Sequence, residues 1–212
     1  MNSFLSPELL KVANEINQWC IDFLAAENPD VRRPKGNQTV CPFIKPSMDN
    51  DTFYLTFHPE VDGRDEDEIE KISLSYIDTF RKTYPVGESQ KLTKALLIVF
   101  NNIKEKDGEI LDIVHNRIKD IFVKNGLMVG QFHPKCKETG AYNTQLKVSR
   151  SPYPLIAVRN MSIHDILFLK NSKEWFMAYN LWFGDKFKKN ELEEHNTHLE
   201  IHYIEAKKKF NL

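Results

Sequence analysis

The hydrophobic positions of the first eighty residues alternate between helical and extended spacing. Ser6-Pro7 is a typical helix start, because serine caps the first turn and proline is tolerated there. Apolar residues then recur at helical spacing up to residue 24, which predicts a helix that ends near Asn28. Residues 51–57 (DTFYLTF) are rich in aromatic and β-branched side chains and predict a strand. The acidic run 62–70 leads into a second predicted helix that reaches Phe80.

The middle of the chain predicts further strands and helices in turn. The run 94–100 (KALLIVF) has the character of a strand buried on both faces. Residues 108–124 have a helical period that Asn125-Gly126 ends, and residues 127–132 predict a third strand. Residues 155–158 predict a short fourth strand, and Ser162 caps a brief helix over 163–169. The core face predicted for the 108–124 helix consists of Ile110, Leu111, Ile113, Val114, Ile118, Ile121 and Phe122.

The C-terminal region is first aromatic and then charged. Residues 175–187 are crowded with aromatic side chains, and residues 191–209 predict a charged helix, with a break between helices at Gly184-Asp185. The order of elements predicts an α+β fold, in which a single mixed sheet of about four strands carries helices mainly on one face. We expect residues 1–170 to form this core domain and residues 171–212 to form a helical segment packed on it or extending from it.

Composition and charge exclude several classes of protein. The net charge of -1 over 212 residues gives no basic field for nucleic acid, and we expect no nucleic-acid partner. No basic-then-apolar leader and no apolar run of about 18 residues is present, so we expect neither a signal peptide nor a membrane partner. Three cysteines without a CxxC pair argue against a disulfide framework and a Cys-based structural zinc site, and favour a reducing cytoplasm. The glycine-rich nucleotide motifs, HExxH and GxSxG are also missing.

A polar loop of about twenty residues follows the third predicted strand, which is long for a compact domain. His133 stands where the strand ends, and it can serve as a general base, as a metal or axial ligand, or only bond a loop carbonyl. Arg150 and Arg159 bracket the fourth strand and offer planar forks for a carboxylate or phosphate, with Ser151 and Tyr153 beside them. The alternative is that Arg150 pairs with a local acid and tethers the loop.

Two further motifs are ambiguous. Cys41 precedes a proline, which places it at the start of an extended segment, either as a reactive thiol or as a small buried hydrophobe. His58 repeats the Phe-His-Pro pattern of His133 and is a reserve candidate. Histidines recur on the predicted C-terminal helix at i, i+3 and i+7 beside acidic residues, as a metal site or, by preference, a solvated face (Glu194, His195, His198, Glu200 and His202).

Several of these motifs together resemble an uncharacterised bacterial family known only as a domain of unknown function. The resemblance spans about residues 15–170 and is carried by Trp19-Cys20, Cys41-Pro42-Phe43, the GLMVGQFHP segment 126–134, the RSPYP segment 150–154 and Arg159. A more distant similarity links the Cys-x-Phe, His-Pro and Arg-Ser segments to heme-dependent guanidine N-oxygenases. That resemblance implies a heme pocket for oxidation of a nitrogenous metabolite, with His133 as axial ligand and His58 in reserve.

Two hypotheses about function follow. The first is a small cytosolic enzyme acting on an anionic or zwitterionic metabolite, with Cys41, His133 and Arg150 as catalytic residues. Arg150, Ser151, Tyr153 and Arg159 would then bind the substrate, with heme or, in a cofactor-free version, with a Cys41–His133 pair. The second is a non-catalytic binding module that forms a homodimer or partner contact through the aromatic segment 175–187.

Overall fold

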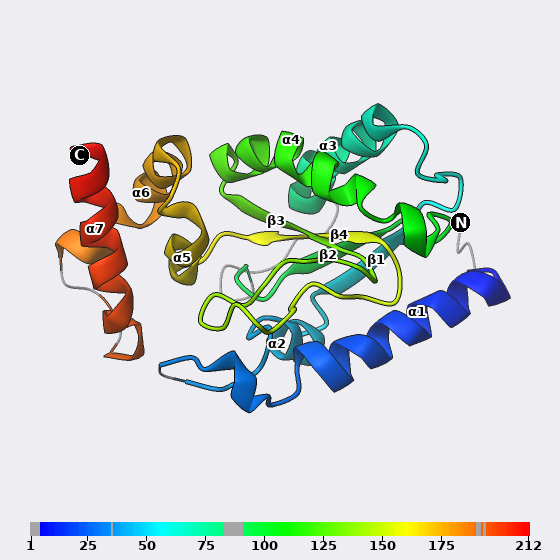
Figure 1. The fold of residues 1–212 in the computed structure, drawn as a ribbon, viewed down its shortest axis with the longest axis horizontal. Coiled ribbons are helices and arrows are strands. Elements are labelled where there is room, and N and C mark those ends of the chain that lie inside the picture. Colours follow the sequence, from blue (N-terminus) through cyan, green and yellow to red (C-terminus); the bar gives the residue numbers. More distant parts are fainter. Residues whose placement is uncertain (1–4, 35, 83–90, 190–191, 193) are drawn as a thin grey trace.

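A computed structural model describes residues 5–34, 36–82, 91–189, 192 and 194–212, and it contains one mixed four-stranded sheet (Figure 1). The strands are β1 (Phe53–Phe57), β2 (Ala95–Val99), β3 (Leu127–Phe132) and β4 (Leu155–Asn160), in the order β1-β2-β4-β3. β1 and β2 are parallel, whereas β4 pairs antiparallel with both β2 and β3. All four strands lie where the sequence predicts them, so the α+β expectation is confirmed.

One face of the sheet is covered by α3 (Glu66–Lys82) and α4 (Ile110–Lys124). Every residue of β2 is buried, as the uninterrupted apolar run predicts. The predicted core face of α4 was too wide, because Ile113 and Ile121 are 45% and 40% exposed. Gly126 ends the turn after α4 at φ 70°, a left-handed conformation that glycine adopts readily.

The opposite face is covered by the N-terminal segment and the long loop (Figure 1). α1 (Pro7–Trp19) starts at the predicted Ser6 cap, whose hydroxyl accepts from the Leu9 N–H at 3.2 Å, and continues as a π-helical turn, Cys20–Leu24. Cys41-Pro42-Phe43 leads into a short helix, α2 (Ile44–Asp49), and not into the extended segment that the sequence predicted. The sheet therefore has cover on both faces, with the two longest helices of the core on one of them.

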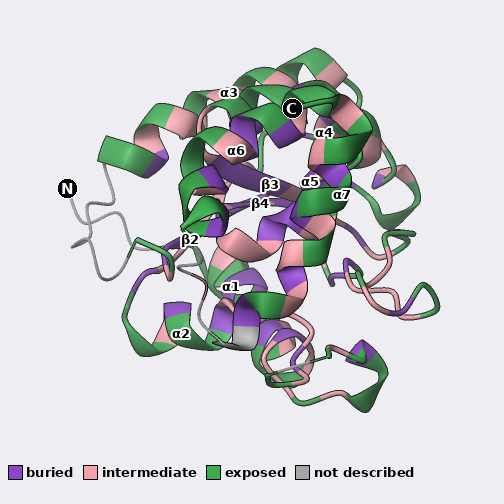
Figure 2. Cartoon of the chain, turned by 90° about the vertical axis from the view of Figure 1, so that its left-hand side faces the viewer, coloured by how far each residue is buried: buried purple, intermediate pink, exposed green. Residues whose placement is uncertain are grey.

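The C-terminal segment forms a second hydrophobic cluster at the α4–β3 side of the core, and Figure 2 shows buried and exposed residues alternating along its helices. The segment contains α6 (Lys173–Lys188) and α7 (Glu200–Phe210), and α5 (Ile166–Leu169) at the end of the core packs in the same cluster. Short 3-10 turns complete the fold: Pro29–Val31, Glu105–Asp107, Ile163–Asp165 and Glu194–Leu199.

Two predictions for this segment were wrong. α6 continues through Gly184, because a glycine costs a long helix only about 1 kcal/mol and this one packs against Asn180 and Tyr203. α7 begins at Glu200, so His198 lies in the preceding 3-10 turn; residue 191, where that helix was predicted to start, lies outside the described residues. Among the described residues, no helix is long and apolar enough to cross a membrane.

Candidate functional site

A cavity of about 290 Å³ lies between the second face of the sheet, the π-helical turn and the long loop, and at the edge strand β3 it also reaches His115 and Lys119 of α4. Its floor includes Gly130, which has no side chain, and Ala157, its pairing partner across β3 and β4. The small floor leaves a hollow that larger side chains such as Trp19, Phe132 and Leu146 surround. A concave, mainly apolar cavity with a few polar groups is the usual form of a small-molecule site.

Cys41 lines this cavity at the turn that starts α2. Its backbone N–H donates to the carbonyl of Leu24 at 2.9 Å, which fixes the turn against the π-helical segment. Burial raises the pKa of the Cys41 thiol, although the N–H groups of Phe43 and Ile44 and the guanidinium of Arg159 act in the opposite direction. The thiol is therefore protonated at neutral pH, yet it is surrounded by groups that would stabilise a thiolate.

Arg159 also lines the cavity, as part of a buried ion pair. Its guanidinium binds Asp165 in a bidentate manner, at 2.8 and 2.5 Å, and the Asp165 side chain is 0% exposed. The guanidinium carbon lies 4.2 Å from the centroid of the Phe43 ring, within the range of a cation–π contact. Phe43, from the Cys41 motif, and Arg159 of β4 therefore meet at the cavity wall, 116 positions apart in the sequence.

Ionisable groups of both signs line the cavity. Among the described residues, the cationic side chains are Arg33, Lys119 and Arg159 and the carboxylates are Glu138 and Asp165, so three positive and two negative groups leave one net positive charge. His115 does not add to this charge at neutral pH, because burial lowers its pKa to about 4. This balance favours a ligand that carries one negative group.

His198 of the C-terminal segment contacts two residues that line the cavity. Tyr142 of the long loop lines the cavity, and its hydroxyl lies 3.2 Å from Nε2 of His198. The His198 ring is 6.5 Å from the ring of His164, another lining residue. His202 instead faces Lys170, with Nδ1 2.8 Å from Nζ, so His198 and His202 do not form the shared metal face considered from the sequence.

The structure does not bring His133 to Cys41. Successive side chains of a strand point to opposite faces, and His133 follows Gln131 onto the α4 side. His58 is likewise away from the cavity, with its ring nitrogens 2.7 Å from Glu60 and 2.9 Å from Tyr76. The shared Cys41–His133 site predicted from the sequence is therefore not formed.

The predicted substrate-binding residues also separate. Arg150 is exposed, and its Nε–H donates to the backbone carbonyl of Cys136 at 3.5 Å, which is a contact within the loop but not the pairing with a local acid that the alternative supposed. The Ser151 hydroxyl donates to the carbonyl of Tyr153, whose own hydroxyl donates to Glu15 of α1 at 2.5 Å. These three residues anchor the end of the loop, and of the predicted binding residues only Arg159 reaches the cavity.

Sequence reasoning missed several lining residues. Asp165 carried a local signal, because Ser162 and Asp165 form a capping box in which the Ser162 N–H donates to Asp165 at 2.7 Å. Arg33, Lys119, Tyr142 and His164 carried no comparable signal, since each reaches the cavity only through the tertiary fold.

The residues present do not fit the heme pocket that the sequence resemblance implied. His133 is 1% exposed, and its Nε2 lies 3.3 Å from both oxygens of Asp112. Neither His133 nor His58 lines the cavity, so neither can offer an axial ligand to a group bound there.

Comparison with known proteins supports only the uncharacterised family. Neither the curated proteins nor the solved structures give a significant match to this chain. A family model described as "Domain of unknown function (DUF6875)" matches residues 13–194, which include both the sheet and all of the cavity residues described above. The chain therefore belongs to the DUF6875 family of domains of unknown function.

Proposed function

We propose that this protein is an enzyme that binds a small, mainly apolar molecule with one acidic group in the cavity, and that Cys41 reacts with it. The observation that carries the proposal is the placement of Cys41 and Arg159 on one cavity wall. A volume of about 290 Å³ is at the small end of ligand sites, so the substrate is a metabolite and not a polymer.

The environment of Cys41 suits covalent chemistry on an electrophilic carbon. The backbone N–H groups of Phe43 and Ile44 and the Arg159 guanidinium all favour the thiolate, which is the nucleophilic form of cysteine. The acidic group of the substrate would bind to the lining residues, whose net charge is positive. His164, which lines the same cavity, is the residue that we propose as acceptor of the thiol proton.

A second candidate function is binding without reaction. The raised pKa of Cys41 favours it, since a thiol that stays protonated behaves as a small hydrophobe in a binding site. Both functions use the same cavity, and they differ in whether Cys41 forms a covalent bond.

Thermal shift screening tests the binding in the cavity that both functions require. Small apolar carboxylic acids and their uncharged amides would be compared on the wild type and on Ala157→Leu, which fills the floor of the cavity. We expect acids to stabilise the wild type more than amides do, and Ala157→Leu to abolish the shift. Ser75→Leu, on an exposed position of α3, is the matched control. An undiminished shift in Ala157→Leu would show that the ligands bind elsewhere.

Mass spectrometry of the protein with those stabilising acids whose apolar part carries an activated carbon–carbon double bond then tests the role of Cys41. Addition of the thiol forms a C–S bond at one carbon, opens the double bond and places the thiol proton on the neighbouring carbon, so no leaving group is needed. A mass adduct or product formation in the wild type that is lost in Cys41→Ser supports the enzyme. Retained binding with no adduct and no turnover in either protein would instead favour the non-catalytic function.

A further inference from the structure

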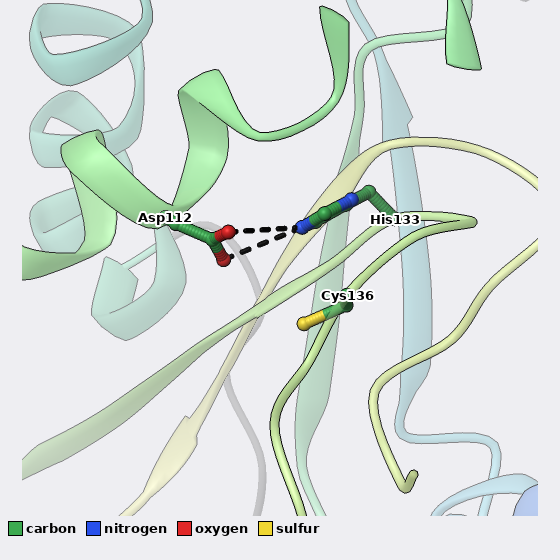
Figure 3. Close-up of side chains that lie close together, drawn as sticks. All are labelled: Asp112, His133 and Cys136. Carbon is green, nitrogen blue, oxygen red and sulfur yellow. Dashed lines mark hydrogen bonds and ion pairs between the residues drawn. The ribbon is translucent and has the colours of Figure 1, made fainter. Parts of the chain in front are cut away.

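Three potential metal ligands converge outside the cavity, on the α4 side of the sheet. Asp112 comes from the first turns of α4, His133 follows β3, and Cys136 lies three residues further along the loop, as Figure 3 shows. Their ligand atoms all lie within 4.8 Å of one another. His133 and Cys136 are 1% and 0% exposed, and Asp112 is partly buried. None of the three lines the cavity.

The separation of Asp112 and His133 is unusual for a hydrogen bond. Nε2 of His133 lies 3.3 Å from each carboxylate oxygen, whereas a charge-assisted N–H···O bond measures about 2.7–2.9 Å. Two ligands about 2.0–2.2 Å from a tetrahedral zinc ion lie about 3.3–3.5 Å from each other. The observed spacing thus matches two ligands of one ion better than a direct hydrogen bond.

Other contacts orient the two side chains without occupying the proposed ligand atom of His133. Gly108 packs against the imidazole so closely that an added Cβ would lie 3.1 Å from Nδ1, which fixes the plane of the ring. Gln131 donates its Nε2–H to Asp112 at 3.1 Å, as outer contacts of metal ligands commonly do. Nδ1 of His133 is buried without a hydrogen-bond partner among the described residues, so packing and not hydrogen bonding sets its orientation.

We propose that Asp112, His133 and Cys136 bind one transition-metal ion, with zinc as the best match. A thiolate, an imidazole and a carboxylate together favour Zn²⁺ over the hard ions Mg²⁺ and Ca²⁺, which prefer oxygen ligands alone. The sulfur would move by at most about 1.3 Å to reach the roughly 3.5 Å separation of tetrahedral ligands. Three protein ligands leave the fourth position for water. The ion would hold the start of the long loop against α4.

The sequence did not indicate this site, because the site does not consist of paired cysteines. His133 and Cys136 have the two-residue spacing of a chelating pair, but Asp112 lies 21 positions earlier on another element. The inference does not depend on the cavity or on Cys41, so it can fail or succeed independently of the proposed function.

Cobalt titration of metal-free protein, purified without a polyhistidine tag, tests the site. The wild type should bind one equivalent of Co²⁺ and develop a thiolate-to-cobalt charge-transfer band. Cys136→Ser should lose that band. His133→Gln or Asp112→Asn should weaken the affinity for Co²⁺ by more than the loss of about 10–100-fold that changes to residues outside the ligand set typically cause. Cys41→Ser is the matched thiol control and should keep the band. A band that Cys41→Ser removes and Cys136→Ser retains would overturn the proposal.

X-ray absorption at the zinc edge supplies a measurement that needs no variant. Wild-type protein with one equivalent of zinc should show one sulfur ligand and nitrogen or oxygen ligands otherwise. A spectrum with no sulfur or with two sulfurs would refute this ligand set, as would a folded wild type that binds no zinc.

Discussion

The Arg159–Asp165 pair gives the sharpest stability prediction, and Asp165→Asn is the change that tests it. Asn has nearly the same shape but removes the negative charge, so it leaves a guanidinium that is only 19% exposed without its counter-charge. Removing one partner of a buried pair usually costs about 3–5 kcal/mol. We expect about 3 kcal/mol here, because the Phe43 ring still contacts the guanidinium and Asn can keep part of the hydrogen bonding.

Urea unfolding and thermal unfolding both measure this loss. For a chain of this size, about 3 kcal/mol corresponds to a fall of roughly 6–12 °C in Tm. The control is Asp185→Asn, which removes an exposed carboxylate that lies 3.2 Å from Lys188 and should change the free energy of unfolding by less than about 0.5 kcal/mol. A loss for Asp165→Asn no larger than that of the control would refute the reasoning.

A double variant separates loss of the pair from loss of a single partner. Arg159→Met combined with Asp165→Asn removes both charges and keeps a side-chain oxygen that can accept from the Ser162 N–H, so it should recover at least half of the stability that Asp165→Asn alone loses. If the double variant were less stable than Asp165→Asn, the pair itself would be the source of stability and the desolvation argument would be wrong.

Three further changes test other parts of the structure. Gly126→Ala should lower the free energy of unfolding in urea by about 2 kcal/mol, because φ is 70° and the new Cβ would lie 2.6 Å from the Trp182 ring. In a Trp182→Ala background the loss should fall to about 1 kcal/mol, and equal losses in both backgrounds would contradict the Trp182 contact. As the pH drops from 6.5 to 4, the free energy of unfolding of the wild type should fall by about 2–3 kcal/mol more than that of His115→Gln. The reason is that His115 has a pKa of about 4 in the folded protein, so the unfolded chain takes up the proton first. Parallel stability curves against pH for the two proteins would exclude a lowered pKa of His115. Arg159→Met should raise the pKa of Cys41 further, so iodoacetamide should alkylate Cys41 several-fold more slowly at pH 8 than in the wild type. Peptide mass spectrometry measures the rate of alkylation, and an unchanged rate would show that the guanidinium does not act on the thiol.

Local signals in the sequence predicted the elements of the fold well. The Ser6 cap, the apolar run of β2 and the left-handed Gly126 are each determined by a few neighbouring residues, and the structure confirms all three. The exposed Ile113 and Ile121 of α4 show the limit of this reasoning, because helical spacing gives the direction of an apolar face but not how much of it the sheet covers.

The site was harder to predict, because its residues meet only through the tertiary fold. Unusual local sequence pointed to both Cys41 and Arg159, and they do share the cavity. His133 was correctly placed at the end of a strand, but its side of the sheet was not considered. The alternation along β3 sends Phe132 towards the cavity and His133 towards α4, so knowledge of which face α4 covers would have separated the two.

The length of the loop after β3 follows from the positions of its two ends. At its start, His133 and Cys136 lie against Asp112 on the α4 side of the sheet. At its end, Tyr153 binds Glu15 of α1 on the opposite side, where the cavity lies. The chain between them passes from one face to the other and supplies the cavity wall at Tyr142 and Leu146. A short turn between β3 and β4 would complete the sheet equally well but would remove that wall, so the loop is explained by the cavity and not by the requirements of the sheet.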